Sequence, residues 1–196
     1  MNLTHTLRSV FLGMPKMLRG QPAERAGVER LARHRLDFGQ AARLVVSSPA
    51  FASGRIIPVR NTQDGESLSP PLRWGAVPAS TRSLALIVED PDAPTPAPFV
   101  HWLAANISPT QDALTEGLPG EGVDLAVQGR HTMLGKGYLG CAPPKGDVPH
   151  HYHFQLFALD TLLDLEPGFG RTALLRAIQG HIVGFGETVG LYVRPE

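Results

Sequence analysis

The feature that most restricts the fold of this chain is a proline-rich stretch near its middle. An apolar run, 84–88, ends in the motif Asp90-Pro91-Asp92, and His101 opens a second apolar run after three more prolines. Proline fixes the φ angle and removes a backbone donor, so this stretch is neither helix nor central strand. It reads as a stiff loop at the end of a buried strand. Such loops, held on a rigid scaffold, often carry binding or catalytic groups.

Short apolar runs separated by turn residues indicate a mainly β protein. Glycine and proline account for 21 and 18 residues and occur along the whole chain. This distribution favours an all-β or loop-rich domain over a helix bundle. Only one later segment, 171–182, has helical periodicity. Short or alternating apolar runs predict strands at 44–47, 84–89, 102–107, 151–159 and 188–193. A β-sandwich with one late helix is therefore expected.

Composition sets the broad class of the protein. The 196 residues are enough for one sizeable core and few for two. Basic and acidic residues number 18 each, which gives no reason to expect nucleic acid as a partner. The single cysteine, Cys141, excludes an intramolecular disulfide and a cysteine-based zinc site. No apolar run approaches the roughly 18 residues of a membrane helix, and a signal peptide is not recognisable, so we expect a cytoplasmic protein.

The N-terminal part, 1–41, differs from the rest and is interpreted as an extension of a domain formed by 42–196. Apolar residues in 1–20 recur every three or four positions, with three basic residues and no acidic one, which predicts a cationic amphipathic helix. Such a helix either binds a membrane surface or targets the chain, or it packs on its own domain or on a second subunit. We favour packing, and with it a possible homodimer, because apolar stripes usually face a core. Residues 21–36 read as a linker or a short exposed helix.

A second proline-stiffened loop, 140–149, leads directly into a strand that begins with five aromatic or imidazole residues in a row, 150–154. Because side chains alternate between the two faces of a strand, His150 and Tyr152 share one face, and His151 and His153 share the other. Only one of these pairs can share a site with His101. The spacing alone leaves both open.

Together the two loops resemble the motifs of the phosphatidylethanolamine-binding protein family, whose bacterial branch is called Raf-kinase-inhibitor-like. The resemblance covers about residues 42–194 and rests on Asp90-Pro91-Asp92-Ala93-Pro94, on His101 about ten residues later, and on Pro143-Pro144-Lys145-Gly146 followed by His150-His151-Tyr152. It implies a two-sheet antiparallel Greek-key β-sandwich with a C-terminal helix. It also implies cis peptide bonds at Pro94 and Pro143, and one small pocket for phosphate groups where the two motifs meet.

Carried over position by position, the resemblance implies that the pocket is lined by Asp90, Asp92, His101, Pro144, His150 and Tyr152. In such a pocket, protonated imidazoles and a phenol donate to phosphate oxygens, while carboxylates orient the imidazoles and favour their protonation. The expected function is binding of a small phosphate-type or other anionic ligand by a regulatory or inhibitor-type module without a cofactor. The resemblance also leaves open a protein partner, a kinase or a protease. Relatives commonly have Arg where this chain has His151, which leaves the identity of the ligand open.

Three other interpretations use the same residues. The carboxylates and histidines supply enough N and O ligands for zinc, although His151-x-His153 alone is a weak signal. A hydrolase could cleave an ester or phosphoester with His101 or His150 as base, but neither motif contains a serine and no nucleophile elbow is present. Cys141 could act as a nucleophile, although a packed thiol is the simpler interpretation. Finally, the acids and histidines could serve only to hold the loops together.

Overall fold

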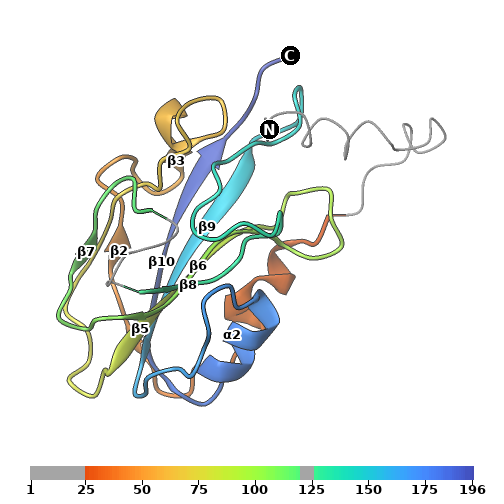
Figure 1. Ribbon diagram of the computed structural model, residues 1–196. Helices are drawn as coiled ribbons and strands as arrows, with labels where there is room; N and C mark the ends of the chain where they lie inside the picture. The colour runs from red at the N-terminus through yellow and green to blue at the C-terminus, as the bar shows by residue number, and fades with distance from the viewer. Residues whose placement is uncertain (1–24, 120–125) are drawn as a thin grey trace.

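A computed structural model of the chain describes residues 25–119 and 126–196 (Figure 1). The amphipathic helix expected in residues 1–20 lies outside this part. The described residues form a mainly β fold in which a large sheet lies between a small sheet and one α-helix, α2 (Figure 1). The expected β-sandwich with a C-terminal helix is therefore confirmed.

The strands pair mostly with antiparallel neighbours. The large sheet has the order β1-β10-β9-β5-β6-β8, and β3 also pairs with β10. Its strands are β1 (Ala42–Arg43), β3 (Arg55–Ile56), β5 (Ser83–Asp90), β6 (Phe99–Ile107), β8 (Val127–Gln128), β9 (His150–Leu159) and β10 (Ile182–Tyr192). The small sheet consists of β2 (Val46–Ser47), β4 (Leu72–Trp74) and β7 (Ala113–Leu114). One difference from the expected antiparallel sandwich is that β1 and β3 run parallel to β10, so the large sheet is mixed at this edge.

Both faces of the large sheet are covered, which explains why β5 and β9 are almost continuously buried. One face packs against the small sheet through side chains such as Leu86, Trp102 and Phe154. The other face packs against α2 through side chains such as Ile87 and Phe157. The strands that border the two predicted motifs, β5 and β9, therefore lie in the buried centre of the large sheet.

Helix α2 (Arg171–Ile178) is shorter than the helix expected at 171–182. Gly180 has a φ of 82°, a left-handed conformation that glycine adopts without strain and that commonly follows the end of a helix. The chain then enters β10 at Ile182. The helical periodicity was thus correct at its start and wrong by one turn at its end.

The segment before β1 lies against the end of β5. It contains two 3₁₀ turns, η3 (Val28–Arg30) and η4 (Ala32–His34), and a third such turn, η5 (Val59–Asn61), occurs later. Leu31 and Ala32 are buried. In Figure 1 this segment begins beside the loop that joins β5 and β6.

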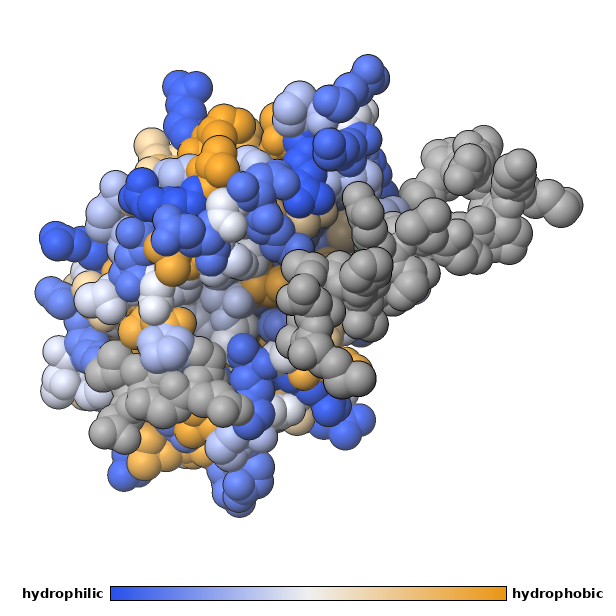
Figure 2. Space-filling model, turned by 45° about the horizontal axis from the view of Figure 1, so that its top comes forward, coloured by the Kyte–Doolittle hydropathy of each residue, from blue (hydrophilic) through white to orange (hydrophobic). Residues whose placement is uncertain are grey.

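The surface has no dominant apolar region on the face shown in Figure 2, where apolar groups form separate small patches among hydrophilic side chains. Large apolar side chains that are exposed, such as Val45, Leu134 and Leu162, belong to different parts of the chain. Within the described ranges, no helix has both the length and the apolar character needed to cross a membrane.

Candidate functional site

The site is built around Asp90, the last residue of β5. Its Oδ1 atom accepts the backbone N–H groups of Asp92 at 2.8 Å and of Ala93 at 3.1 Å. A short acidic side chain that bonds the backbone two residues on stabilises a turn in which proline cannot donate. The second oxygen, Oδ2, is left to face the neighbouring strand. The described residues contain no cis peptide bond, so the cis bonds expected at Pro94 and Pro143 are not found.

His150, the first residue of β9, lies between two carboxylates. Its Nδ1 is 2.7 Å from Oδ2 of Asp90, and its Nε2 is 3.3 Å from Oδ2 of Asp147. Burial, with only 1% of the residue exposed, by itself lowers the pKa of His150. The hydrogen bonds and charges of the two carboxylates outweigh burial and raise the pKa. The geometry therefore favours an imidazolium that donates from both nitrogens.

His101 in β6 has the opposite character. Its Nδ1 donates to the carbonyl oxygen of Leu139 at 2.8 Å, and its ring packs edge-on against Tyr152 with the centroids 5.0 Å apart. Burial lowers the pKa of His101, and the nearby Asp90 charge only partly opposes this effect. At neutral pH the ring is therefore neutral, with its proton on Nδ1 and a lone pair on Nε2.

Tyr152 completes the inner cluster from the same face of β9 as His150, as strand parity predicted. Its side chain is fully buried, and its hydroxyl finds no hydrogen-bond partner within the described part of the chain. Burial raises the pKa of Tyr152 far above its usual value, so the phenol keeps its proton. A buried hydroxyl without a partner is uncommon in native proteins. Its O–H group is thus a donor without an acceptor among the described residues.

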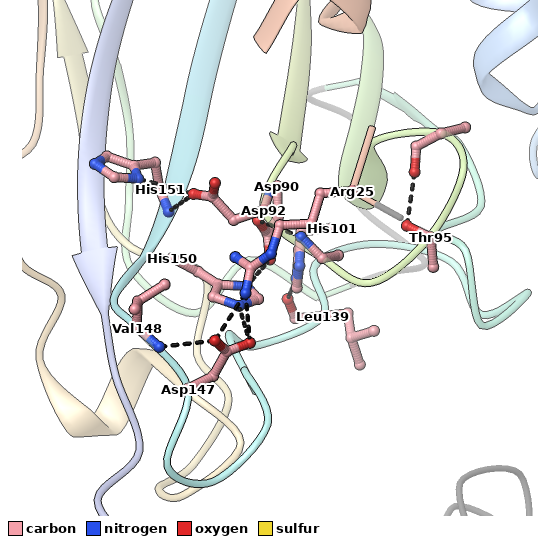
Figure 3. Close-up of polar contacts among 12 residues, drawn as sticks. Arg25, Asp90, Asp92, Thr95, His101, Leu139, Asp147, Val148, His150 and His151 are labelled. Atoms are coloured by element: carbon pink, nitrogen blue, oxygen red, sulfur yellow. Dashed lines mark hydrogen bonds and ion pairs between the residues drawn. The ribbon is translucent and has the colours of Figure 1, made fainter. Parts of the chain in front are cut away.

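The other two residues that the resemblance implied lie at the rim. Oδ2 of Asp92 accepts from His151, both from the backbone N–H at 2.9 Å and from ring Nδ1 at 2.8 Å (Figure 3). Pro144 is exposed, and its carbonyl oxygen accepts the backbone N–H of Asp147 at 3.3 Å. The structure thus brings Asp90, His101, His150 and Tyr152 together, and it places Asp92 and Pro144 around them.

Two residues of the site were not identified from the sequence. One is Asp147, whose carboxylate contacts His150; its position in the second loop, three residues before His150, was a signal that could have been used. The other is Arg25, whose guanidinium lies beside Asp147 with N–O distances of 2.7 and 2.9 Å (Figure 3). No motif in the sequence marks Arg25.

Two of the side chains considered as a metal ligand or a nucleophile, His153 and Cys141, lie in positions that do not favour these roles. Among the residues that the structure describes, no group of three or more His, Cys, Asp or Glu is placed to hold a metal ion. His153 turns to the opposite face of the sheet, where its Nδ1 is 3.3 Å from Glu187. Cys141 is fully buried, and burial raises its pKa well above the usual value. Its thiol therefore stays protonated and is a poor nucleophile.

The two histidines of the cluster are expected to titrate on opposite sides of the ordinary value of 6.5. In an NMR titration of the ring protons, His150 should have a pKa above 6.5 and His101 one below it. Replacing Asp90 with asparagine should lower the pKa of His150, because its nearest negative charge is removed. Equal pKa values for the two rings, or a His150 ring that does not respond to D90N, would contradict the assigned protonation states.

Comparison with known proteins connects this geometry to one family. The family model described as phosphatidylethanolamine-binding protein matches residues 47–193. The chain is 37% identical over 190 residues to UPF0098 protein PH1269 of Pyrococcus horikoshii, which covers 94% of this chain and 95% of that protein.

Two solved structures of moderate sequence identity have a similar fold. The first is a putative phosphatidylethanolamine-binding protein homolog, CT736 of Chlamydia trachomatis, with 39% identity, a TM-score of 0.70, and coverage of 80% of this chain and 99% of that chain. The second is YbcL of E. coli, described as a member of the mammalian PEBP family, with 31% identity, a TM-score of 0.70, and coverage of 78% and 99%.

Proposed function

The chain belongs to the phosphatidylethanolamine-binding protein family, and we propose that it binds a small phosphate-type anion at the cluster of Asp90, His101, His150 and Tyr152. The observation that carries this proposal is the buried Tyr152 hydroxyl, which has no hydrogen-bond partner among the described residues and whose ring lies 5.0 Å from that of His101, centroid to centroid. His101 uses Nδ1 for the carbonyl oxygen of Leu139, so Nε2 is the ring atom that remains for a ligand. We infer that a ligand oxygen accepts from both side chains.

The chemistry of His101 couples anion binding to a proton. With Nδ1 committed to Leu139, the ring can donate to a phosphate oxygen only when Nε2 also carries a proton, or when the ligand itself brings one. Protonation in the free protein is opposed by burial and by the positive charge of His150. A bound anion would offset that penalty. Affinity should therefore increase as the pH falls through the range in which His101 titrates.

Asp90 acts indirectly in this proposal. Its two oxygens are used by the turn and by His150, so the carboxylate supports the donors and does not itself meet the ligand. We assign the protein to a regulatory or inhibitor-type role, because the cluster supplies donors for an anion and no activated nucleophile.

The test is calorimetric titration with inorganic phosphate, phosphorylethanolamine and phosphotyrosine at pH 5.5 and 8.5. Binding should be at least about tenfold tighter at pH 5.5, because a charge-assisted hydrogen bond contributes roughly 1.5–3 kcal/mol. His101→Ala should abolish most of the affinity. His181→Ala is the matched control, since His181 is an exposed histidine that pairs with Asp160 at 2.9 Å.

Three results would overturn the proposal. Equal affinity at both pH values would mean that His101 protonation is not coupled to the ligand, and binding that survives His101→Ala would place the ligand elsewhere. If the protein hydrolyses a model phosphoester and Asp90→Asn loses this activity, the protein is a hydrolase and not a binding protein.

A further inference from the structure

The carboxylate of Asp147 is held in the way that proteins hold a bound anion. The Arg25 guanidinium approaches both of its oxygens, at 2.7 and 2.9 Å. The backbone N–H of Val148 donates to Oδ1 at 2.8 Å, and the His150 ring lies 3.3 Å from Oδ2. A guanidinium, an imidazolium and an amide are the groups that commonly bind carboxylate or phosphate oxygens.

The position of Asp147 on the protein surface makes it easy to displace. Its side chain is 23% exposed and that of Arg25 is 35% exposed, whereas that of His150 is 1% exposed. The carboxylate thus covers the outer nitrogen of a buried imidazolium. Ion pairs at such exposure stabilise a protein by only about 0–1 kcal/mol, so a competing anion needs little energy to take its place.

The loop that carries Asp147 is short and defined by a turn. The backbone N–H of Asp147 donates to the carbonyl oxygen of Pro144, and Gly146 between them has a φ of 73°. Residues Lys145, Gly146 and Val148 are exposed. A change in the side-chain torsions of Asp147 would move its carboxylate into water without disturbing a packed neighbour.

The segment that follows Arg25, in contrast, is attached to the opposite wall of the site. Two residues further on, the backbone N–H of Gly27 donates to the carbonyl oxygen of Pro91 at 3.2 Å, and the Arg30 guanidinium donates to the carbonyl oxygen of Pro96. The segment is thereby fixed to the loop that follows Asp90. If Asp147 moved away, the backbone that carries Arg25 would therefore keep its place, and the guanidinium would remain within reach of an anion bound where the carboxylate had been.

We propose that Asp147 is an internal occupant of an anion position formed by Arg25, His150 and the Val148 amide, and that an external phosphate group binds by displacing it. This inference rests on the proposed function and adds a residue to it. Arg25, which precedes the region matched by the family, becomes a ligand-binding residue supplied by the N-terminal segment. Asp147 sets the affinity by competing with the ligand.

The test compares phosphate binding by full-length variants at pH 5.5. Asp147→Asn should bind inorganic phosphate about three- to tenfold more tightly, because it removes a competing charge and leaves the shape of the side chain unchanged. Arg25→Gln should bind about tenfold or more weakly, since a charge-assisted contact to phosphate is lost. Asp160→Asn is the matched control: Asp160 also pairs with a histidine, His181, and its variant should bind as the wild type does.

Parallel titrations with phosphorylethanolamine distinguish the source of the phosphate group. If Asp147→Asn increases the affinity for both ligands by the same factor, the phosphate group itself displaces Asp147. If the affinity increases for phosphorylethanolamine alone, the position binds a headgroup, and the proposal of a general phosphate site is wrong.

The possible failures are separable. If wild-type binding is lost in His101→Ala but unchanged in Asp147→Asn and Arg25→Gln, the proposed function stands and the displacement proposal is overturned. If neither the wild type nor Asp147→Asn binds phosphate, the proposed function fails and the displacement proposal fails with it. Thermal melts of each variant establish that it is folded, which is expected because both side chains are partly exposed.

Discussion

Replacing Glu89 with alanine is expected to lower the free energy of unfolding by about 3 kcal/mol. Glu89 is the penultimate residue of β5 and points to the face opposite the anion site, where it is fully buried. Its Oε2 accepts the backbone N–H of Ala32 at 2.8 Å and the side-chain amide of Gln155 at 2.8 Å. Its Oε1 accepts from the Arg171 guanidinium.

This single carboxylate joins three elements that are distant in the sequence: turn η4, strand β9 and the start of α2. Without it, two buried donors and one cation lose their acceptor. Each unsatisfied buried donor costs about 1–3 kcal/mol, and breaking a buried ion pair costs roughly 3–5 kcal/mol. The Arg171 side chain is 22% exposed and can regain water, so we place the expected loss at the lower end.

Thermal and urea unfolding of the variants measure this effect. A loss of about 3 kcal/mol should lower the melting temperature by roughly 6–12 °C in a chain of this size. Glu89→Gln should lie between the wild type and Glu89→Ala, since it keeps one acceptor oxygen but turns an NH₂ group toward a donor. Glu116→Ala is the control: that carboxylate is 32% exposed and accepts from Arg60 and from the Asn61 amide. Because the amide keeps the Leu68 carbonyl oxygen as a second acceptor, the removal should cost only about 1 kcal/mol. A Glu89→Ala variant no less stable than Glu116→Ala would show that the network contributes little.

The sequence predicted the central strands because their signal is local. The runs at 84–89 and 151–159 are apolar, bounded by turn residues, and coincide closely with β5 and β9. The alternation of side chains along a strand has a fixed period of two, so His150 and Tyr152 could be placed on one face without any knowledge of the partner strands. The short strands β1 and β3 have no such period, and their parallel pairing with β10 could not be predicted.

The sequence alone could not predict the protonation states of the two histidines or the contacts between residues that are distant in the chain. Arg25 and Asp147 are 122 positions apart in the sequence, and no pattern in the chain between them indicates their contact. The motifs suggested that both histidines donate to an anion. Which of them is charged depends on burial and on the acceptor at each nitrogen: two carboxylates for His150, but one carbonyl oxygen for His101. Such information arises only when the loops are placed in space.

Asp90→Ala is expected to destabilise the protein by about 2–4 kcal/mol, because it removes the acceptor for two backbone N–H groups and leaves the buried His150 cation without its closest counter-charge. Asp90→Asn separates these two effects. The amide oxygen can still accept from Asp92 and Ala93, so the turn is kept, while the negative charge beside His150 is lost. We therefore expect Asp90→Asn to retain much of the stability at alkaline pH and to lose it at acid pH.

The pH dependence has a defined sign. The carboxylates raise the pKa of His150 above its unfolded value of 6.5, so their stabilisation of the charged ring is fully present below that value and is lost as the pH rises through the folded-state pKa. The difference in unfolding free energy between wild type and Asp90→Asn, measured in urea, should hence be larger at pH 5.5 than at pH 9. A difference that stays the same at both pH values would mean that Asp90 stabilises the turn alone. In that case His150 is not held as a cation by Asp90, and the charge that we assign to the anion site must come from Arg25.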